Sequence, residues 1–96
     1  MRGFAKQRAA MPRDEILAIL IDCARKAFGE PELAFEESTR FDEIEAWDSA
    51  NHLRMVVSME RAFGIRFANA DLMRLDVVGD LSAVIERRYA EAHGGA

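Results

Sequence analysis

Apolar residues recur at three- and four-residue steps in several stretches of the chain, a spacing that predicts amphipathic helices. In the first stretch, residues 14–28, the apolar positions are Ile16, Ile19, Leu20, Cys23, Ala27 and Phe28. Gly29 and Pro31 follow directly and predict its end, because glycine suits the left-handed residue after a helix and proline cannot continue it. Cys23 lies among the apolar positions of this helix and is small, so it is expected to be buried.

The second stretch predicts a helix over residues 49–63, closed by Gly64. At 100° per residue its polar side chains gather in one arc of about 80°, formed by Asn51, Arg54, Ser58 and Arg61. The apolar arc of this helix is wide, which predicts that the helix contacts other parts of the chain on more than one side. Two polar residues interrupt it: Glu60 is expected to pair with Arg66 or reach the rim, and His52 to be a partly buried structural residue.

The remaining segments complete an all-α fold. A short helix is expected to start at Asn69 over "ADLMRL", and a last one to run over residues 77–92 with Asp76 as its cap. Ile65 and Phe67 are expected to anchor a loop in the core. The long connection over 30–48 is expected to be pinned by its own apolar side chains and to hold a helical turn capped by Ser38 or Thr39, the apolar residues being Phe35, Phe41 and Ile44.

These elements predict a small four-helix bundle with a long loop between helices one and two and a short third helix. The domain is expected over residues 14–92, after a flexible basic arm at 1–13 and before a frayed tail at 93–96. With 96 residues, half of them hydrophobic and 31% charged, the chain suits one soluble domain with one core.

Composition also narrows the function. A net charge of −4 argues against nucleic-acid binding, and the longest apolar run, 16–21, is too short to span a membrane. A single cysteine and no secretory signal favour the cytoplasm, and a monomer is expected. No second ligand lies near His52 at metal-binding spacing, and no nucleophile and base pair is recognisable, so neither a metal site nor an enzyme is expected.

Charge is unevenly distributed around residue 49. Six acids lie between residues 36 and 48 against the one basic Arg40. This acidic loop is either a docking surface for basic partners or a solvated loop. At its end, Trp47-Asp48-Ser49-Ala50 joins the loop to the second helix, where the Ser49 hydroxyl is either a helix cap worth about 1 kcal/mol or an attachment point.

Over about residues 14–90 the chain resembles the acyl carrier proteins, small helical domains that carry substrates on a phosphopantetheine arm. The resemblance rests on Asp48-Ser49 opening the second helix, on "MERAFGIRF" closing it, on Asp71-Leu72 in a short third helix, and on "VVGDL" opening the last. Asp-Ser alone is a weak signal, but all four features in this order are a strong one.

The resemblance implies a 4'-phosphopantetheine attached to Ser49 by a phosphopantetheinyl transferase, with Asp48 helping the transferase recognise the site. Acyl groups would then travel as thioesters between acyl-transferring or acyl-activating enzymes. The apolar residues near this corner are expected mostly to be core, while some could line a cleft for the acyl chain, the candidates being Leu53, Val56, Val57, Met59, Phe63, Leu72 and Met73.

The chain departs from the family beside the serine. Ala50 stands where a larger apolar residue is usual, and Arg54 and Arg61 stand on a helix that is usually acidic in fatty-acid carriers. Like charge would oppose enzymes with a basic docking patch, so a specialised carrier in a dedicated pathway is expected. The partner-docking residues are expected to be Glu43, Glu45, Asp48, Ala50, Arg54 and Arg61.

Two alternatives stay open from the sequence. One is a peptidyl or aminoacyl carrier, which uses the same arm but is loaded by an adenylating enzyme. The other is a helical protein-interaction domain that keeps the fold and is never modified. Asp48 before the serine leans toward the acyl class only weakly.

Overall fold

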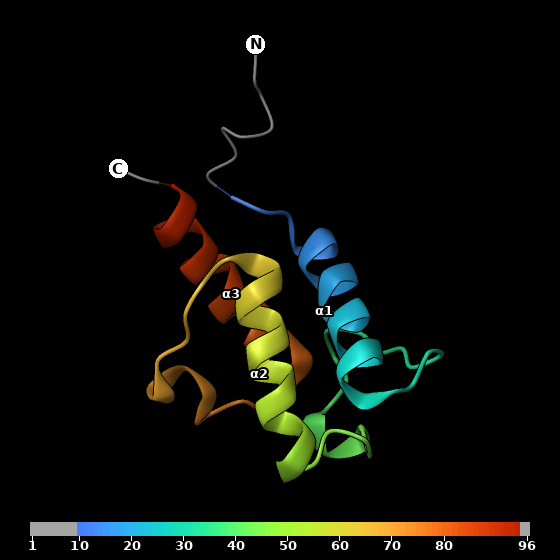
Figure 1. Cartoon of the computed structure of the whole chain (residues 1–96). Helices are drawn as coiled ribbons and strands as arrows, with labels where there is room; N and C mark the ends of the chain where they lie inside the picture. The colour runs from blue at the N-terminus through green and yellow to red at the C-terminus, as the bar shows by residue number, and fades with distance from the viewer. Residues whose placement is uncertain (1–9, 95–96) are drawn as a thin grey trace.

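A computed structural model describes residues 10–94. It contains the α-helices α1 (Arg13–Phe28), α2 (Ser49–Phe63) and α3 (Val78–His93), and the short 3-10 helices η2 (Phe41–Glu43) and η3 (Asn69–Leu72) (Figure 1). No strand occurs among these residues beyond an isolated antiparallel bridge between Arg40 and Val77. The all-α class is confirmed, with three α-helices and η3 in the place of the expected short third helix.

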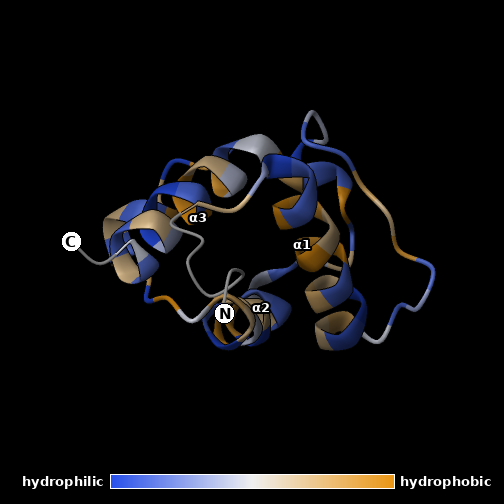
Figure 2. Ribbon diagram, turned by 90° about the horizontal axis from the view of Figure 1, so that it is seen from above, coloured by the Kyte–Doolittle hydropathy of each residue, from blue (hydrophilic) through white to orange (hydrophobic). Residues whose placement is uncertain are grey.

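Each α-helix is amphipathic and turns its apolar side to a common core. Figure 2 shows polar and apolar residues on different sides of the same helices. Helix α1 packs against both α2 and α3, and the side chains that are fully or almost fully buried there include Ile16, Leu20, Cys23, Met55, Met59, Phe63, Leu81 and Ile85. None of the helices over residues 10–94 is long and apolar enough to cross a membrane.

Helices α1 and α2 end where the sequence predicts. Gly29 and Gly64 adopt the left-handed conformation, with φ of 69° and 66°. Their backbone N–H groups donate to the carbonyls of Arg25 and Glu60 in the last turn of each helix. These carbonyls would otherwise lack a donor, because the helix ends before the residue that would supply it. The bounds of α2 agree with the prediction at both ends.

The connection between α1 and α2 crosses the bundle through apolar anchors, as predicted. Phe35 and Ile44 are buried, and Phe41 packs against the core. The predicted cap of the helical turn is wrong, however. Arg40 precedes η2, its backbone N–H donating to the Glu43 carboxylate, while the Thr39 hydroxyl instead accepts the N–H of Glu36.

Two further local predictions are wrong. Asp76 does not cap the last helix: α3 begins after Val77, and the carboxylate of Asp80 accepts the N–H groups of Asp76 and Val77. Glu60 does not pair with Arg66 but accepts the N–H of Phe67 at 2.9 Å. In both cases a carboxylate satisfies exposed backbone donors of a nearby turn.

The expected arm at residues 1–13 overlaps the folded part of the chain. Residues 1–9 lie outside the described residues, but Met11 is buried in the core. Arg13, the first residue of α1, contacts the carboxylates of Glu37 and Glu86. Helix α3 likewise reaches His93, in the expected tail, whose ring nitrogen lies 3.0 Å from the Phe63 carbonyl oxygen.

Candidate functional site

Ser49 is the first residue of α2 and is exposed. The cap of the helix is the residue before it, since Oδ1 of Asp48 accepts the backbone N–H of Asn51 at 2.9 Å. The Ser49 hydroxyl makes no hydrogen bond to any residue that the structure describes. The interpretation of Ser49 as a helix cap is therefore wrong, because Asp48 already performs that role.

The chain just before Ser49 is held rigidly by backbone and side-chain contacts. The side-chain amide of Asn51 donates to the Ala46 carbonyl at 2.8 Å, and the backbone N–H of Trp47 donates to Ile44 at 2.9 Å. The Trp47 ring packs edge-on against Phe28 and Phe41, at centroid distances of 5.5 and 4.8 Å. These contacts fix the serine at a defined corner between loop and helix.

Trp47 also contacts α2 through a side-chain hydrogen bond. Its indole Nε1–H donates to Nδ1 of His52 at 3.1 Å. Indole nitrogen can only donate, so Nδ1 must accept, and the neutral imidazole then carries its proton on Nε2. His52 is a partly buried structural residue, as expected, and its tautomer is fixed by Trp47.

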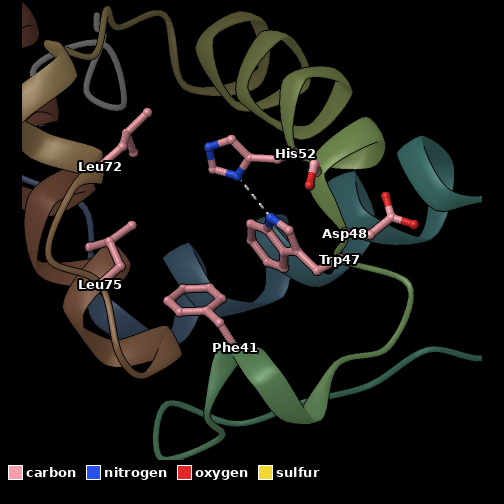
Figure 3. A pocket seen from close by; sticks show the side chains of 7 residues that line it. Phe41, Trp47, Asp48, His52, Leu72 and Leu75 are labelled. Atoms are coloured by element: carbon pink, nitrogen blue, oxygen red, sulfur yellow. Dashed lines mark hydrogen bonds between the residues drawn. The ribbon is translucent and has the colours of Figure 1, made fainter.

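A pocket of about 270 Å³ opens beside the serine. Its lining includes Asp48, Ser49 and His52 at the start of α2. Figure 3 shows Phe41 and Trp47 below His52, with the side chains of Leu72 and Leu75 on the opposite wall. The lining is mainly apolar, with its polar groups gathered at the α2 end. A group attached to Ser49 therefore starts at the edge of an apolar recess.

Few of the acyl-cleft candidates line this pocket. Leu72 does, while Met59 and Phe63 lie in the core and Val56 is partly buried against it. The expectation of burial is wrong for Leu53, Val57 and Met73, which are 69%, 49% and 77% exposed. Leu53 and Val57 point away because the core needs only one side of α2, which Met55, Met59 and Phe63 fill, whereas Met73 follows the end of η3.

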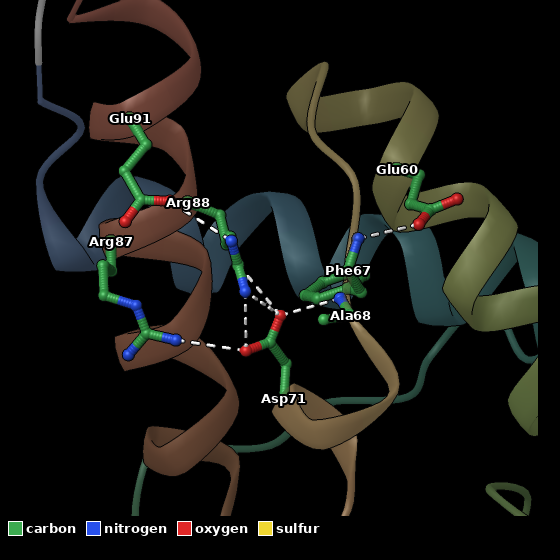
Figure 4. A network of polar contacts seen from close by, with 7 residues as sticks. All are labelled: Glu60, Phe67, Ala68, Asp71, Arg87, Arg88 and Glu91. Atoms are coloured by element: carbon green, nitrogen blue, oxygen red, sulfur yellow. Dashed lines mark hydrogen bonds and ion pairs between the residues drawn. The ribbon is translucent and has the colours of Figure 1, made fainter.

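The pocket's far wall is held by a network of charged groups (Figure 4). Asp71 on η3 accepts from Arg88 Nε at 2.9 Å and from Arg87 Nη2 at 3.1 Å, both on α3, and from the N–H of Ala68 at 2.8 Å. The Ala68 bond and the two guanidinium groups lower the pKa of Asp71, against the opposing effect of burial. Asp71 thus joins the segment that carries Leu72 to α3.

The expected docking residues are all exposed, from the loop before Ser49 to the last turn of α2. Glu43, Glu45, Asp48 and Ala50 are exposed on the loop and first turn, and Arg54 and Arg61 are exposed further along α2. Among residues 10–94, neither Arg54 nor Arg61 takes part in an ion pair. Their charge is free to act on a partner.

The corner fits a covalently bound phosphate. The hydroxyl is exposed, and the N-terminus of a helix attracts negative charge through its dipole and unpaired N–H groups. Asp48 satisfies the N–H of Asn51, and its carbonyl that of His52. Within the described residues the N–H groups of Ser49 and Ala50 have no acceptor. No cluster of metal-binding side chains occurs over the same residues.

Comparisons with known proteins agree with this geometry. A family model described as the phosphopantetheine attachment site matches residues 18–85. The chain is 30% identical to the holo acyl carrier protein of Geobacter metallireducens solved by NMR, with a TM-score of 0.75 over 84% of this chain and 93% of that one. A search of curated proteins found no significant match.

The fold and the family match together define a phosphopantetheine-binding carrier domain. The chain belongs to the acyl carrier protein family. It is a carrier and not an enzyme, and its cofactor is a covalent 4'-phosphopantetheine. Such carriers work with a phosphopantetheinyl transferase and with acyl-handling enzymes.

Sequence reasoning missed most of the pocket lining. Phe41, Trp47, His52 and Leu75 were not among the cleft candidates, although they surround Ser49. Trp47 and His52 lie five residues apart across a loop-to-helix junction, where no single period relates them. An available signal was that His52 follows Ser49 by three residues, which places both on one face of the helix.

Proposed function

We propose that Ser49 carries the 4'-phosphopantetheine and that the protein shuttles thioester-bound acyl groups in a dedicated pathway. In the loading step the Ser49 hydroxyl oxygen attacks the β-phosphate of coenzyme A, held by the transferase. A serine–phosphate bond forms, the pyrophosphate bond breaks, adenosine 3',5'-bisphosphate leaves, and the hydroxyl proton passes to the transferase. The bound group supplies a terminal thiol that holds acyl groups as thioesters.

The unpartnered hydroxyl of Ser49 is the observation that carries the proposal. Asp48 caps α2, so the serine is not needed for the helix end. Trp47 and Asn51 hold the corner in place. The hydroxyl is therefore already positioned, and little conformational entropy is lost when the transferase binds. The first turn then favours the negative charge of the phosphodiester.

The charge of α2 supports a dedicated pathway. Arg54 and Arg61 add unpaired positive charge to its exposed surface, while Glu43 and Glu45 place negative charge on the preceding loop. A partner complementary to this surface needs acidic groups opposite α2 and basic groups opposite the loop. An enzyme adapted to a fully acidic helix would meet like charge at the two arginines.

The carrier would act as a monomer, since its core closes within one chain. We place it in the cytoplasm, because its one cysteine, Cys23, is buried and free, which suits a reducing compartment.

Intact mass tests the attachment site. Incubation with a promiscuous phosphopantetheinyl transferase and coenzyme A should add roughly 340 Da to the wild-type chain and nothing to Ser49→Ala. Ser58→Ala, which alters a serine elsewhere on α2, should load like wild type. An unchanged wild-type mass, or a mass gain in Ser49→Ala, would overturn the assignment.

A further inference from the structure

His52 presents one hydrogen-bond donor of fixed identity beside the pocket. Trp47 Nε1–H occupies Nδ1, so the imidazole proton is on Nε2. In Figure 3 the ring nitrogen away from Trp47 is turned toward the side of the pocket where Leu72 lies. The donor therefore faces the space that a group bound to Ser49 would enter.

Nε2 of His52 makes no hydrogen bond to any residue that the structure describes. Phe41, Leu72 and Leu75 are apolar, and Trp47 already uses its N–H on His52. The two other polar side chains of the lining, Asp48 and Ser49, make no bond to the ring. While the pocket is open, water can accept from Nε2. A hydrocarbon chain that fills the pocket displaces that water and leaves the N–H unpaired, at a cost comparable to a lost hydrogen bond.

We infer that His52 is a specificity-determining residue, which favours acyl groups carrying a keto or hydroxyl oxygen over saturated acyl groups of equal length. The inference rests on the proposed attachment of the arm to Ser49. An oxygen on the cargo accepts the Nε2–H inside the pocket, while its apolar part packs on Leu72, Leu75 and Phe41. A site built around a hydrogen bond rejects an analogue that lacks the partner.

The pocket's size agrees with such a cargo. Its volume of about 270 Å³ equals that of about nine water molecules in the liquid, at roughly 30 Å³ each. Acyl groups of short to medium length fit this space. The Nε2–H of His52 then distinguishes cargoes that match in length but differ in oxygen content.

The test compares two cargoes of equal length, octanoyl and β-keto-octanoyl, each transferred together with its phosphopantetheine arm from the coenzyme A ester to Ser49 of the unmodified full chain. Intact mass first confirms loading on Ser49; a failure there overturns the proposed function and this inference with it. In loaded wild type, the keto form should melt about 4 to 8 °C above the octanoyl form, the shift expected for one net hydrogen bond. Equal melting temperatures would overturn the inference alone.

Variants locate the effect. In His52→Leu the difference between the two cargoes should disappear, and comparing cargoes within one variant cancels any general loss of stability. His93→Leu is the matched control, because His93 contacts Phe63 and Tyr89 and does not line the pocket; it should keep the difference. A difference that survives in His52→Leu would show that another group selects the cargo.

A readout on unaltered protein guards against misfolded variants. Side-chain nitrogen NMR of His52 should show the proton on Nε2, because Nδ1 accepts from Trp47. Exchange of that proton with water should slow in the keto form and not in the octanoyl form. A proton on Nδ1, or equal exchange in both forms, would overturn the inference.

Discussion

The carboxylate of Asp48 caps α2 through the N–H of Asn51, and so leaves the neighbouring Ser49 hydroxyl unused by the fold. Two adjacent residues that could each have capped the helix thus have separate roles. Asp48 stabilises the helix end, and Ser49 remains available for modification.

The first prediction separates these roles by stability. Asp48→Ala should lower the free energy of unfolding by about 1 kcal/mol through loss of the cap, while Ser49→Ala should change it by less than about 0.5 kcal/mol. Urea denaturation of the unmodified chain measures both. Asp48→Asn is the control, since an amide oxygen can still accept the Asn51 N–H. Equal losses for Asp48→Ala and Ser49→Ala would contradict the assignment of the cap.

The second prediction concerns acid stability and Asp71. Its pKa is lowered in the folded state, by the Ala68 N–H and then the guanidinium groups of Arg88 and Arg87. Its stabilising contribution is therefore complete above the ordinary aspartate pKa of about 4, and is lost as the pH falls through the folded-state value. Asp71→Asn should flatten the loss of stability between about pH 5 and pH 2, as measured by urea midpoints.

A surface ion pair provides the comparison for Asp71. Asp22 contacts Lys26 on the outside of α1, and both side chains are mostly exposed. Asp22→Asn should change the free energy of unfolding by less than about 0.5 kcal/mol near neutral pH. Asp71→Ala should cost roughly 1 to 2 kcal/mol there, since it also loses an acceptor for a backbone N–H. Equal effects of the two replacements would show that Asp71 does not hold η3.

The third prediction compares two glycines of matched backbone. Gly29 and Gly64 both have φ near 70°, but a Cβ on Gly29 would meet nothing within 4 Å, while one on Gly64 would lie 3.2 Å from the His93 ring. Gly29→Ala should cost about 1 kcal/mol through backbone strain alone. Gly64→Ala should cost more, because the ring must also move. Thermal melts check the order, and the extra cost should vanish in a His93→Ala background.

The fourth prediction tests the basic surface of α2. Arg54→Glu combined with Arg61→Glu should raise kcat/KM roughly tenfold with a fatty-acid ketosynthase that has a basic docking patch, because attraction replaces like-charge repulsion. Arg66→Glu, an exposed charge reversal beyond the end of α2, is the control and should have little effect. If that ketosynthase accepts wild type as well as its own carrier, the proposal of a dedicated pathway fails.

Local chemistry explains which parts of the fold could be predicted. The apolar period and the two left-handed glycines defined α1 and α2, because these signals act within one helix. The caps at η2 and α3 were mispredicted because several polar residues lie close together there, and sequence does not show which carboxylate reaches which N–H. Asp80 rather than Asp76 accepts at α3 because it lies inside the first turn.

The sequence by itself determined the all-α class, the helix that begins at Ser49, and the family resemblance that points to a carrier. Only the tertiary structure decided that Asp48 is the cap, that Leu53 and Val57 face solvent, and that Trp47 fixes the proton of His52 beside a pocket. The reason is physical: helix formation and termination depend on near neighbours in the chain. A pocket depends on residues such as Phe41 and Leu75, which come together only when the core packs.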